Sequence, residues 1–193
     1  MDKNIIETID NCMKRIWCYD IKDDYNKCKL LQEDTMKNSM YYYLRCRLGE
    51  EFLDANNLRI FTEFHDGLFK GTGFRADLAI VQTKHIHIDN IEGYIGDKEN
   101  IESIIAVIEL KYKGNVSAAE EAIYKDFDKI NEYMKILPED TKYYLGIIHE
   151  KYWSKEERCW ADPAGYKYPK GKVTELTASY DENDEMMFEV FEL

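Results

Sequence analysis

The spacing of apolar residues in the first third of the chain predicts two helices. Apolar positions recur every three or four residues over Ile5–Trp17 and again over Leu30–Phe52, which is the period of a helix that buries one face. The stretch Asp20–Lys27 between them is crowded with charge and is predicted to be a connection. The second helix is expected to end near Asn56 and Asn57, because asparagine tolerates the left-handed conformation that ends many helices.

The middle of the chain has the patterns of β-strands. Leu58–Phe64 and Phe74–Val81 alternate between apolar and other residues, and Ile104–Lys111 is apolar almost throughout. A strand of the last kind is typically buried on both faces, at the centre of a sheet that helices cover. A helix over Ser117–Met134 and a further strand over Lys142–His149 are predicted to follow, with Ser117 as the helix cap.

Two further segments are predicted to be hairpins. Lys172–Ser179 and Met186–Val190 are expected to pair antiparallel through the polar turn at 181–184, and Lys84–Ser103 is expected to form a hairpin-like excursion. The whole pattern predicts one α/β domain over residues 1–193, with a central mixed β-sheet flanked by helices. Its core would span about 30–149, with a helical extension over 1–29 and a basic, aromatic loop and hairpin over 150–193.

Composition favours a folded protein outside the membrane. Hydrophobic residues make up 45% of the 193 residues and charged residues 33%, which is typical of a globular chain and not of a disordered one. The longest apolar run is too short to cross a bilayer, and the N-terminus does not resemble a signal peptide, so a cytoplasmic location is expected. Five cysteines without a C-x-x-C pair predict reduced thiols.

The net charge of −12 argues against a broad basic surface for duplex nucleic acid. One segment differs, because Lys151–Lys172 holds six basic residues against three acidic ones, together with several aromatic rings. This mixture suits contacts to phosphates and stacked bases, although the same tryptophans could instead cover the core. The candidate nucleic-acid-binding residues are Lys151, Trp153, Lys155, Arg158, Lys167 and Lys170.

Glu109 and Lys111 form the candidate chemical centre. Side chains two apart on a strand point the same way, so both charges lie together at the end of an otherwise apolar strand, where burying charge is costly. If the two strands pair, Asp77 approaches Glu109. Two carboxylates suit Mg²⁺, which keeps several waters and is often completed by a substrate phosphate. The arrangement favours metal-assisted hydrolysis of a phosphodiester, with Lys111 adding fixed positive charge.

These segments resemble the PD-(D/E)XK nuclease superfamily, which has the restriction-endonuclease-like fold. The matching residues are Phe74–Val81, Ile105–Lys111 and the helix containing Lys125–Ile130, and the order of elements over about 30–149 is the α-β-β-β-α-β core of that fold. Ala76 stands where the family name has proline. The gap between Asp77 and Glu109 is also long, which is consistent with an insertion that shapes substrate access.

The resemblance implies roles for individual residues. Asp77 and Glu109 would bind Mg²⁺, or Mn²⁺ in its place, with the backbone carbonyl of Leu110, and Lys111 would position or activate water. Glu33 matches the acidic residue that many members carry on the helix before the sheet. Glu63, at the end of the first strand, is a further candidate.

Other polar and aromatic clusters have plainer interpretations. His85 and His87 share a strand face but lack further metal ligands, so exposed histidines are favoured. His149 and Glu150 either border the site or end a strand in solvent, and the second is favoured. The three tyrosines at 41–43 point around their helix, so at least one must lie off the core face, and helix packing is favoured over base stacking.

The function predicted from the sequence is a metal-dependent nuclease that hydrolyses DNA in preference to RNA, with no organic cofactor. One alternative is a catalytically silent member of the fold that serves as an acidic protein-binding or inhibitory module. Another is a subunit of a larger nucleic-acid-processing complex. A protein partner or a second copy of the chain is compatible with each hypothesis.

Overall fold

The computed structural model describes residues 2–65, 75–84, 101–113, 120–152 and 159–193, and within them six strands form one mixed sheet in sequence order. The parallel pairs are β3 with β4 and β4 with β5, and the other neighbours are antiparallel. The strands are β1 (Leu58–Phe64), β2 (Ala76–Thr83), β3 (Ile101–Lys113), β4 (Lys142–Tyr152), β5 (Val173–Tyr180) and β6 (Met186–Glu192).

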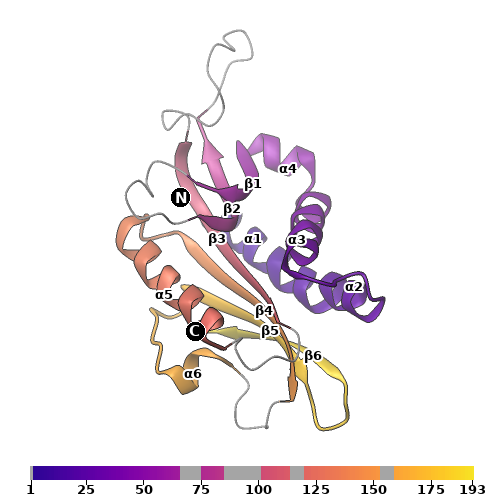
Figure 1. Cartoon of the computed structure of the whole chain (residues 1–193). Coiled ribbons are helices and arrows are strands. Elements are labelled where there is room, and N and C mark those ends of the chain that lie inside the picture. Colours follow the sequence, from indigo (N-terminus) through magenta and orange to yellow (C-terminus); the bar gives the residue numbers. More distant parts are fainter. Residues whose placement is uncertain (1, 66–74, 85–100, 114–119, 153–158) are drawn as a thin grey trace.

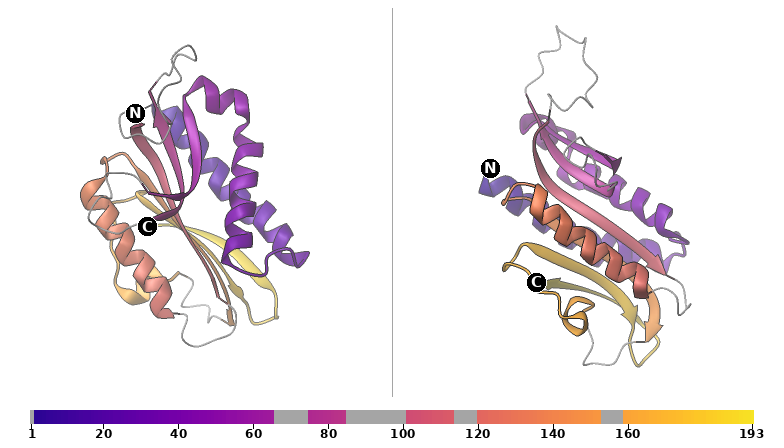
Figure 2. Two further views of the ribbon diagram at one scale, coloured as in Figure 1. Left: turned by 45° about the horizontal axis from the view of Figure 1, so that its top comes forward. Right: turned by 60° about the vertical axis from the view of Figure 1, so that its left-hand side comes forward.

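Helices cover both faces of this sheet (Figure 1). The N-terminal helices α1 to α4 lie on one face, and α5 and α6 lie on the other, as the two views of Figure 2 also show. The helices are α1 (Lys3–Arg15), the π-helix η1 (Ile16–Ile21), α2 (Lys22–Asn26), α3 (Glu33–Leu48), α4 (Glu50–Ala55), α5 (Glu120–Ile136) and α6 (Ala161–Ala164).

The two faces of the sheet bury separate hydrophobic cores. On β2, Leu78 and Ile80 pack toward the N-terminal helices, whereas Ala79 and Val81 pack toward α5. This division follows from the period of two in a strand, and it confirms the predicted alternation. The central position of β3 likewise confirms the prediction made from its apolar run.

Glycine at position 146 permits a close approach between β4 and the first core. A Cβ atom there would lie 2.7 Å from Leu110 Cδ2 and 3.3 Å from Trp17 Cζ3. Trp17 is fully buried, and its indole N–H donates to the carbonyl of Thr177 at 3.1 Å. The N-terminal helices are therefore anchored to the centre of the sheet by packing and by a hydrogen bond.

The predicted connection over Asp20–Lys27 is wrong, because the chain stays helical through η1 and α2. Ile21 is fully buried four residues after Trp17, so it extends the apolar stripe into the charged stretch. The predicted second helix is divided at Gly49, whose φ of +79° favours glycine. Asn57 has a φ of +53°, which confirms the left-handed asparagine expected at the end of this region.

Most of the other predicted elements are confirmed with shifted ends. The C-terminal hairpin is antiparallel as predicted, and β5 also joins it to β4, so it extends the main sheet. Most of the excursion over Lys84–Ser103, with His85 and His87, and the cap at Ser117 lie outside the described residues. All five cysteines have free thiols. In the part of the chain that is described, no helix has the length and apolar character needed to cross a membrane.

Candidate functional site

The structure brings the predicted site residues together at one end of β3. Asp77 lies near the start of β2, Glu109 and Lys111 lie on β3, and Glu33 opens α3. Leu78 pairs with Ile108 in the antiparallel register, which places Asp77 beside Glu109 on the neighbouring strand. Asp77 Oδ2 accepts a hydrogen bond from the backbone N–H of Leu110 at 2.8 Å, so this carboxylate is fixed against β3.

Glu109 is the most deeply buried charged residue of the site, with 1% of its surface exposed. Lys129 Nζ donates to its Oε2 at 2.6 Å, and the hydroxyl of Tyr133 donates to its Oε1 at 2.7 Å. Burial raises the pKa of Glu109 to about 8, and nearby Asp77 adds to this while Lys129 opposes it. The carboxylate is therefore held in a buried setting where its negative charge is costly without a cation.

Lys111 links the two helical layers. Its Nζ lies 3.2 Å from Glu33 Oε2 on α3 and 3.2 Å from Asp126 Oδ2 on α5. Burial alone would lower the pKa of Lys111, but Asp126 and Glu33 raise it above its ordinary value, so the ammonium stays charged. Asp126 is only 5% exposed, and it also lies 3.6 Å from Lys129. Lys111 is thus held between the carboxylates of Glu33 and Asp126.

Asp77 also faces a cation on α3. Lys37 Nζ lies 4.0 Å from Asp77 Oδ1 and forms an ion pair with Glu63. Glu63 in turn accepts from Arg75 Nε at 2.6 Å, and its φ of +52° is strained for a residue other than glycine. Burial raises the pKa of Asp77, partly offset by the Leu110 N–H. Glu63, the further candidate from the sequence, is therefore paired with two cations and sets the position of Lys37.

The three residues on α5 were missed as site residues. Asp126, Lys129 and Tyr133 follow one another at intervals of three and four residues, so they share one face of the helix. Their signal was present in the sequence as polar side chains on the side that also carries the buried Phe127 and Ile130. This sequence signal is weak, because most helices carry many polar residues.

The carboxylates of Asp77 and Glu109, on neighbouring strands, are of the ligand type that Mg²⁺ prefers. Burial is the main cause that raises the pKa of both carboxyl groups, and the charge of Asp77 raises that of Glu109 further, so a divalent cation near them would offset this cost. No group of three His, Cys, Asp or Glu side chains with metal-binding geometry occurs among the described residues. One or two carboxylates are nevertheless sufficient for Mg²⁺ when water and substrate phosphate complete its shell. The role of the Leu110 carbonyl stays a prediction.

An open cleft of about 670 Å³ borders the site at Glu33. Glu150 also lines this cleft, and its carboxylate accepts hydrogen bonds from Tyr25 at 3.1 Å and Tyr112 at 3.0 Å. The favoured interpretation of His149 and Glu150 as a solvated strand end is wrong, since His149 is buried and Glu150 is bound by tyrosines. The complete lining is Leu31, Gln32, Glu33, Asp34, Tyr112, Lys113 and Glu150.

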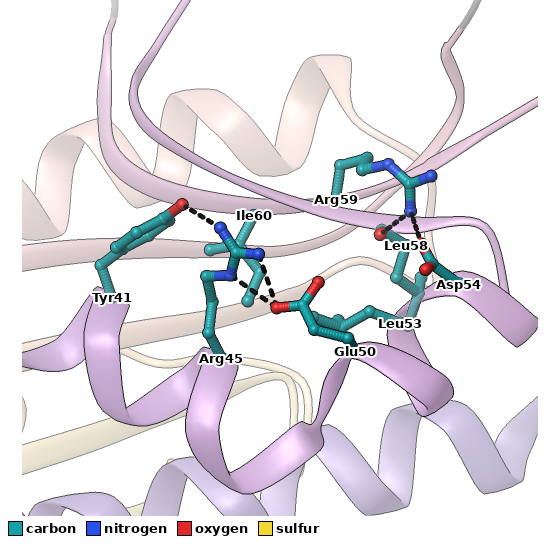
Figure 3. Close-up of a pocket in the computed structure, with 8 residues that line it drawn as sticks. All are labelled: Tyr41, Arg45, Glu50, Leu53, Asp54, Leu58, Arg59 and Ile60. Atoms are coloured by element: carbon teal, nitrogen blue, oxygen red, sulfur yellow. Dashed lines mark hydrogen bonds and ion pairs between the residues drawn. The ribbon is translucent and has the colours of Figure 1, made fainter.

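A second, smaller pocket of about 210 Å³ lies between α3, α4 and β1 (Figure 3). Both of its arginines are paired, Arg45 with Glu50 and Arg59 with Asp54. It is therefore a charge-balanced surface pocket. Tyr41 lines it and accepts from Arg45 at 3.1 Å, in keeping with the predicted helix-packing role of this tyrosine.

Those aromatic residues of the basic segment that the structure describes pack on the core. Trp160 is buried, with its ring 6.2 Å from that of Tyr124, and Tyr166 stacks on Phe127 at 4.8 Å. Fully buried Glu175, which the sequence reasoning missed, accepts from the backbone N–H of Trp160 at 2.8 Å. Its only signal was a charged residue within the predicted strand 172–179.

The basic residues of that segment are placed only in part. Lys167 and Lys170 are exposed. Trp153, Lys155 and Arg158 lie outside the described residues, as does the side chain of Lys151. The predicted nucleic-acid contacts of this segment stay a prediction.

Comparison with protein-family models, with curated proteins and with solved structures finds no match to this chain.

Proposed function

We propose that the protein is a metal-dependent nuclease with a PD-(D/E)XK-type site, hydrolysing phosphodiester bonds of DNA in preference to RNA. The observation that carries the proposal is the meeting of Asp77, Glu109 and Lys111 at one end of the central strand, with further charges from α3 and α5. Burying so many charges is costly, and a hydrophobic cluster would stabilise the fold at lower cost. Such clusters of perturbed, buried charge are typical of functional sites.

The order of the elements supports the same proposal. Helix α3, strands β1 to β3, helix α5 and strand β4 follow in the order α-β-β-β-α-β. This is the order of the restriction-endonuclease-like core, with β5 and β6 as additions to the sheet.

Each residue of the site has a defined chemical task in this proposal. Asp77 and Glu109, with the Leu110 carbonyl, would hold Mg²⁺ or Mn²⁺, which supplies a lowered pKa for water and stabilises negative charge on the phosphate. Lys111 brings a fixed positive charge to the reacting phosphate and orients water. Glu33 and Asp126 hold that ammonium in place from two sides.

Substrate binding would depend on the basic residues at 151–172 and on a partner. Lys167 and Lys170 are exposed and available to phosphates. The chain as a whole carries a net charge of −12, so unaided binding to long duplexes should be weak at physiological salt. A partner subunit or a second copy of the chain would supply the missing contacts.

A nuclease assay tests the proposal. With Mg²⁺ or Mn²⁺ the protein should degrade DNA, and Asp77→Ala or Lys111→Ala should lower the rate by at least about 100-fold, because each removes charge stabilisation in the transition state. Lys125→Ala is the control, since Lys125 is exposed on α5. Equal cleavage by the Asp77 and Lys111 variants would refute the assignment.

One observation favours the second candidate, an inactive module that binds protein through its acidic surface. Both carboxylate oxygens of Glu109 are already bound, by Lys129 and by Tyr133. If the network is purely structural, divalent metal should leave the Tm unchanged, and affinity capture should return a protein in stoichiometric amount. A metal-induced rise in Tm favours the nuclease.

A further inference from the structure

We propose that Lys129 is a built-in counter-ion of the metal site, which holds Glu109 in the metal-free protein and competes with the divalent ion for that carboxylate. The inference rests on the proposed function, because it assigns a role to Lys129 at the same site. It adds a residue that sets how tightly the metal binds.

The ammonium of Lys129 balances the charge of Glu109, as a bound metal ion would. Its Nζ lies 2.6 Å from Glu109 Oε2, and its positive charge also opposes the rise in the pKa of Asp77, the other predicted ligand. Among the described residues it supplies the one ammonium at ion-pair distance from Glu109. A divalent ion placed between Asp77 and Glu109 would be repelled by it.

The ammonium has a second acceptor to which it can move. Asp126 Oδ1 lies 3.6 Å from Lys129 Nζ, and the lysine side chain is 26% exposed, so its end is not enclosed. When metal takes Glu109, Lys129 can therefore turn toward Asp126 and solvent. The exposed side also leaves it free to meet a substrate phosphate.

The other two groups near Glu109 do not compete in this way. Tyr133 is a neutral donor, and the carboxylate oxygen that accepts its hydrogen bond keeps another lone pair for a metal. Lys111 is held by Glu33 and Asp126. Among the described residues, Lys129 is thus the cation that the metal has to displace from Glu109.

The test is the affinity of the protein for Mg²⁺ alone, measured by calorimetry at pH 8.5. Lys129→Gln keeps a hydrogen-bond donor but removes the charge, and it should bind Mg²⁺ at least about tenfold more tightly than the wild type. Its Tm should also rise more on addition of Mg²⁺. Lys129→Arg keeps the charge and should resemble the wild type. Lys125→Gln, an exposed change of equal charge on the same helix, is the control.

The outcomes separate the two proposals. If the wild type binds Mg²⁺ and Lys129→Gln binds it equally or more weakly, the role proposed for Lys129 is wrong and the metal site still stands. No binding by the wild type or by any variant overturns the metal site and this inference with it. If Lys129→Gln does not fold, the Nζ NMR signal of Lys129 in the wild type decides, since Mg²⁺ should shift it and an unchanged signal refutes the proposal.

Discussion

Replacing Glu109 with glutamine should change how the stability of the protein depends on pH. The carboxyl is buried, and burial raises its pKa from 4.5 to about 8 in the folded protein. The native state therefore binds this proton more tightly than the unfolded chain does. Between the two pKa values the free energy of unfolding falls as the pH rises, and the contribution is fully present only below about pH 4.5.

The size of the effect follows from the separation of the two pKa values. One unit corresponds to about 1.4 kcal/mol, so the window from 4.5 to about 8 limits the loss to roughly 5 kcal/mol. The hydrogen bonds from Lys129 and Tyr133 favour the ionised carboxylate and offset part of the cost of burying it. As the pH rises through this window, the free energy of unfolding of the wild type should fall by about 2–5 kcal/mol relative to that of Glu109→Gln. Glutamine has the same shape as glutamate but no proton to lose.

Urea unfolding at pH 5, 6, 7 and 8 in the presence of a chelator measures this difference. The stability of the wild type should fall toward that of Glu109→Gln, or below it, as the pH rises. Glu102→Gln on the same strand is the control, because Glu102 is exposed and its replacement should leave the profile unchanged. Parallel profiles for the wild type and Glu109→Gln would refute the reasoning that this carboxyl is buried at an electrostatic cost.

Two further predictions concern packing and hydrogen bonding around the site. Gly146→Ala should lower the free energy of unfolding by about 1–3 kcal/mol, because the added methyl group would overlap Leu110 and crowd Trp17, and chemical denaturation measures this. An unchanged stability would mean that the two side chains move aside freely. Tyr133→Phe removes the hydroxyl that donates to Glu109 and should cost about 1–2 kcal/mol at pH 9 in metal-free buffer, whereas no loss by thermal unfolding would show that the hydrogen bond is dispensable.

The parts of the fold that follow from local pattern could be predicted from the sequence. Strand β3 was predicted because an uninterrupted apolar run needs cover on both faces, and β1 was predicted with its observed ends. The helical stretch at 20–26 could not be recognised, since charged neighbours hide the buried Ile21. The parallel pairing of β4 with β5 joins segments distant in the chain, and no short-range signal specifies it.

The site also contains residues that the sequence pattern predicts and residues that it does not. Glu109 and Lys111 could be predicted because charge within an apolar strand is costly, and Asp77 followed from strand pairing. Lys129 and Tyr133 could not be predicted as site residues, because they approach Glu109 only when α5 packs on the sheet. Helix packing angles and depths are not encoded in a residue spacing.

A crystal of the protein soaked in Mn²⁺ tests the central claim most directly, since the ion is identified by its anomalous scattering. The account predicts one anomalous peak between the carboxylates of Asp77 and Glu109, about 2.1–2.3 Å from an oxygen of each, with Lys129 turned away from Glu109. A map with no peak there, and Lys129 still bound to Glu109, would contradict it.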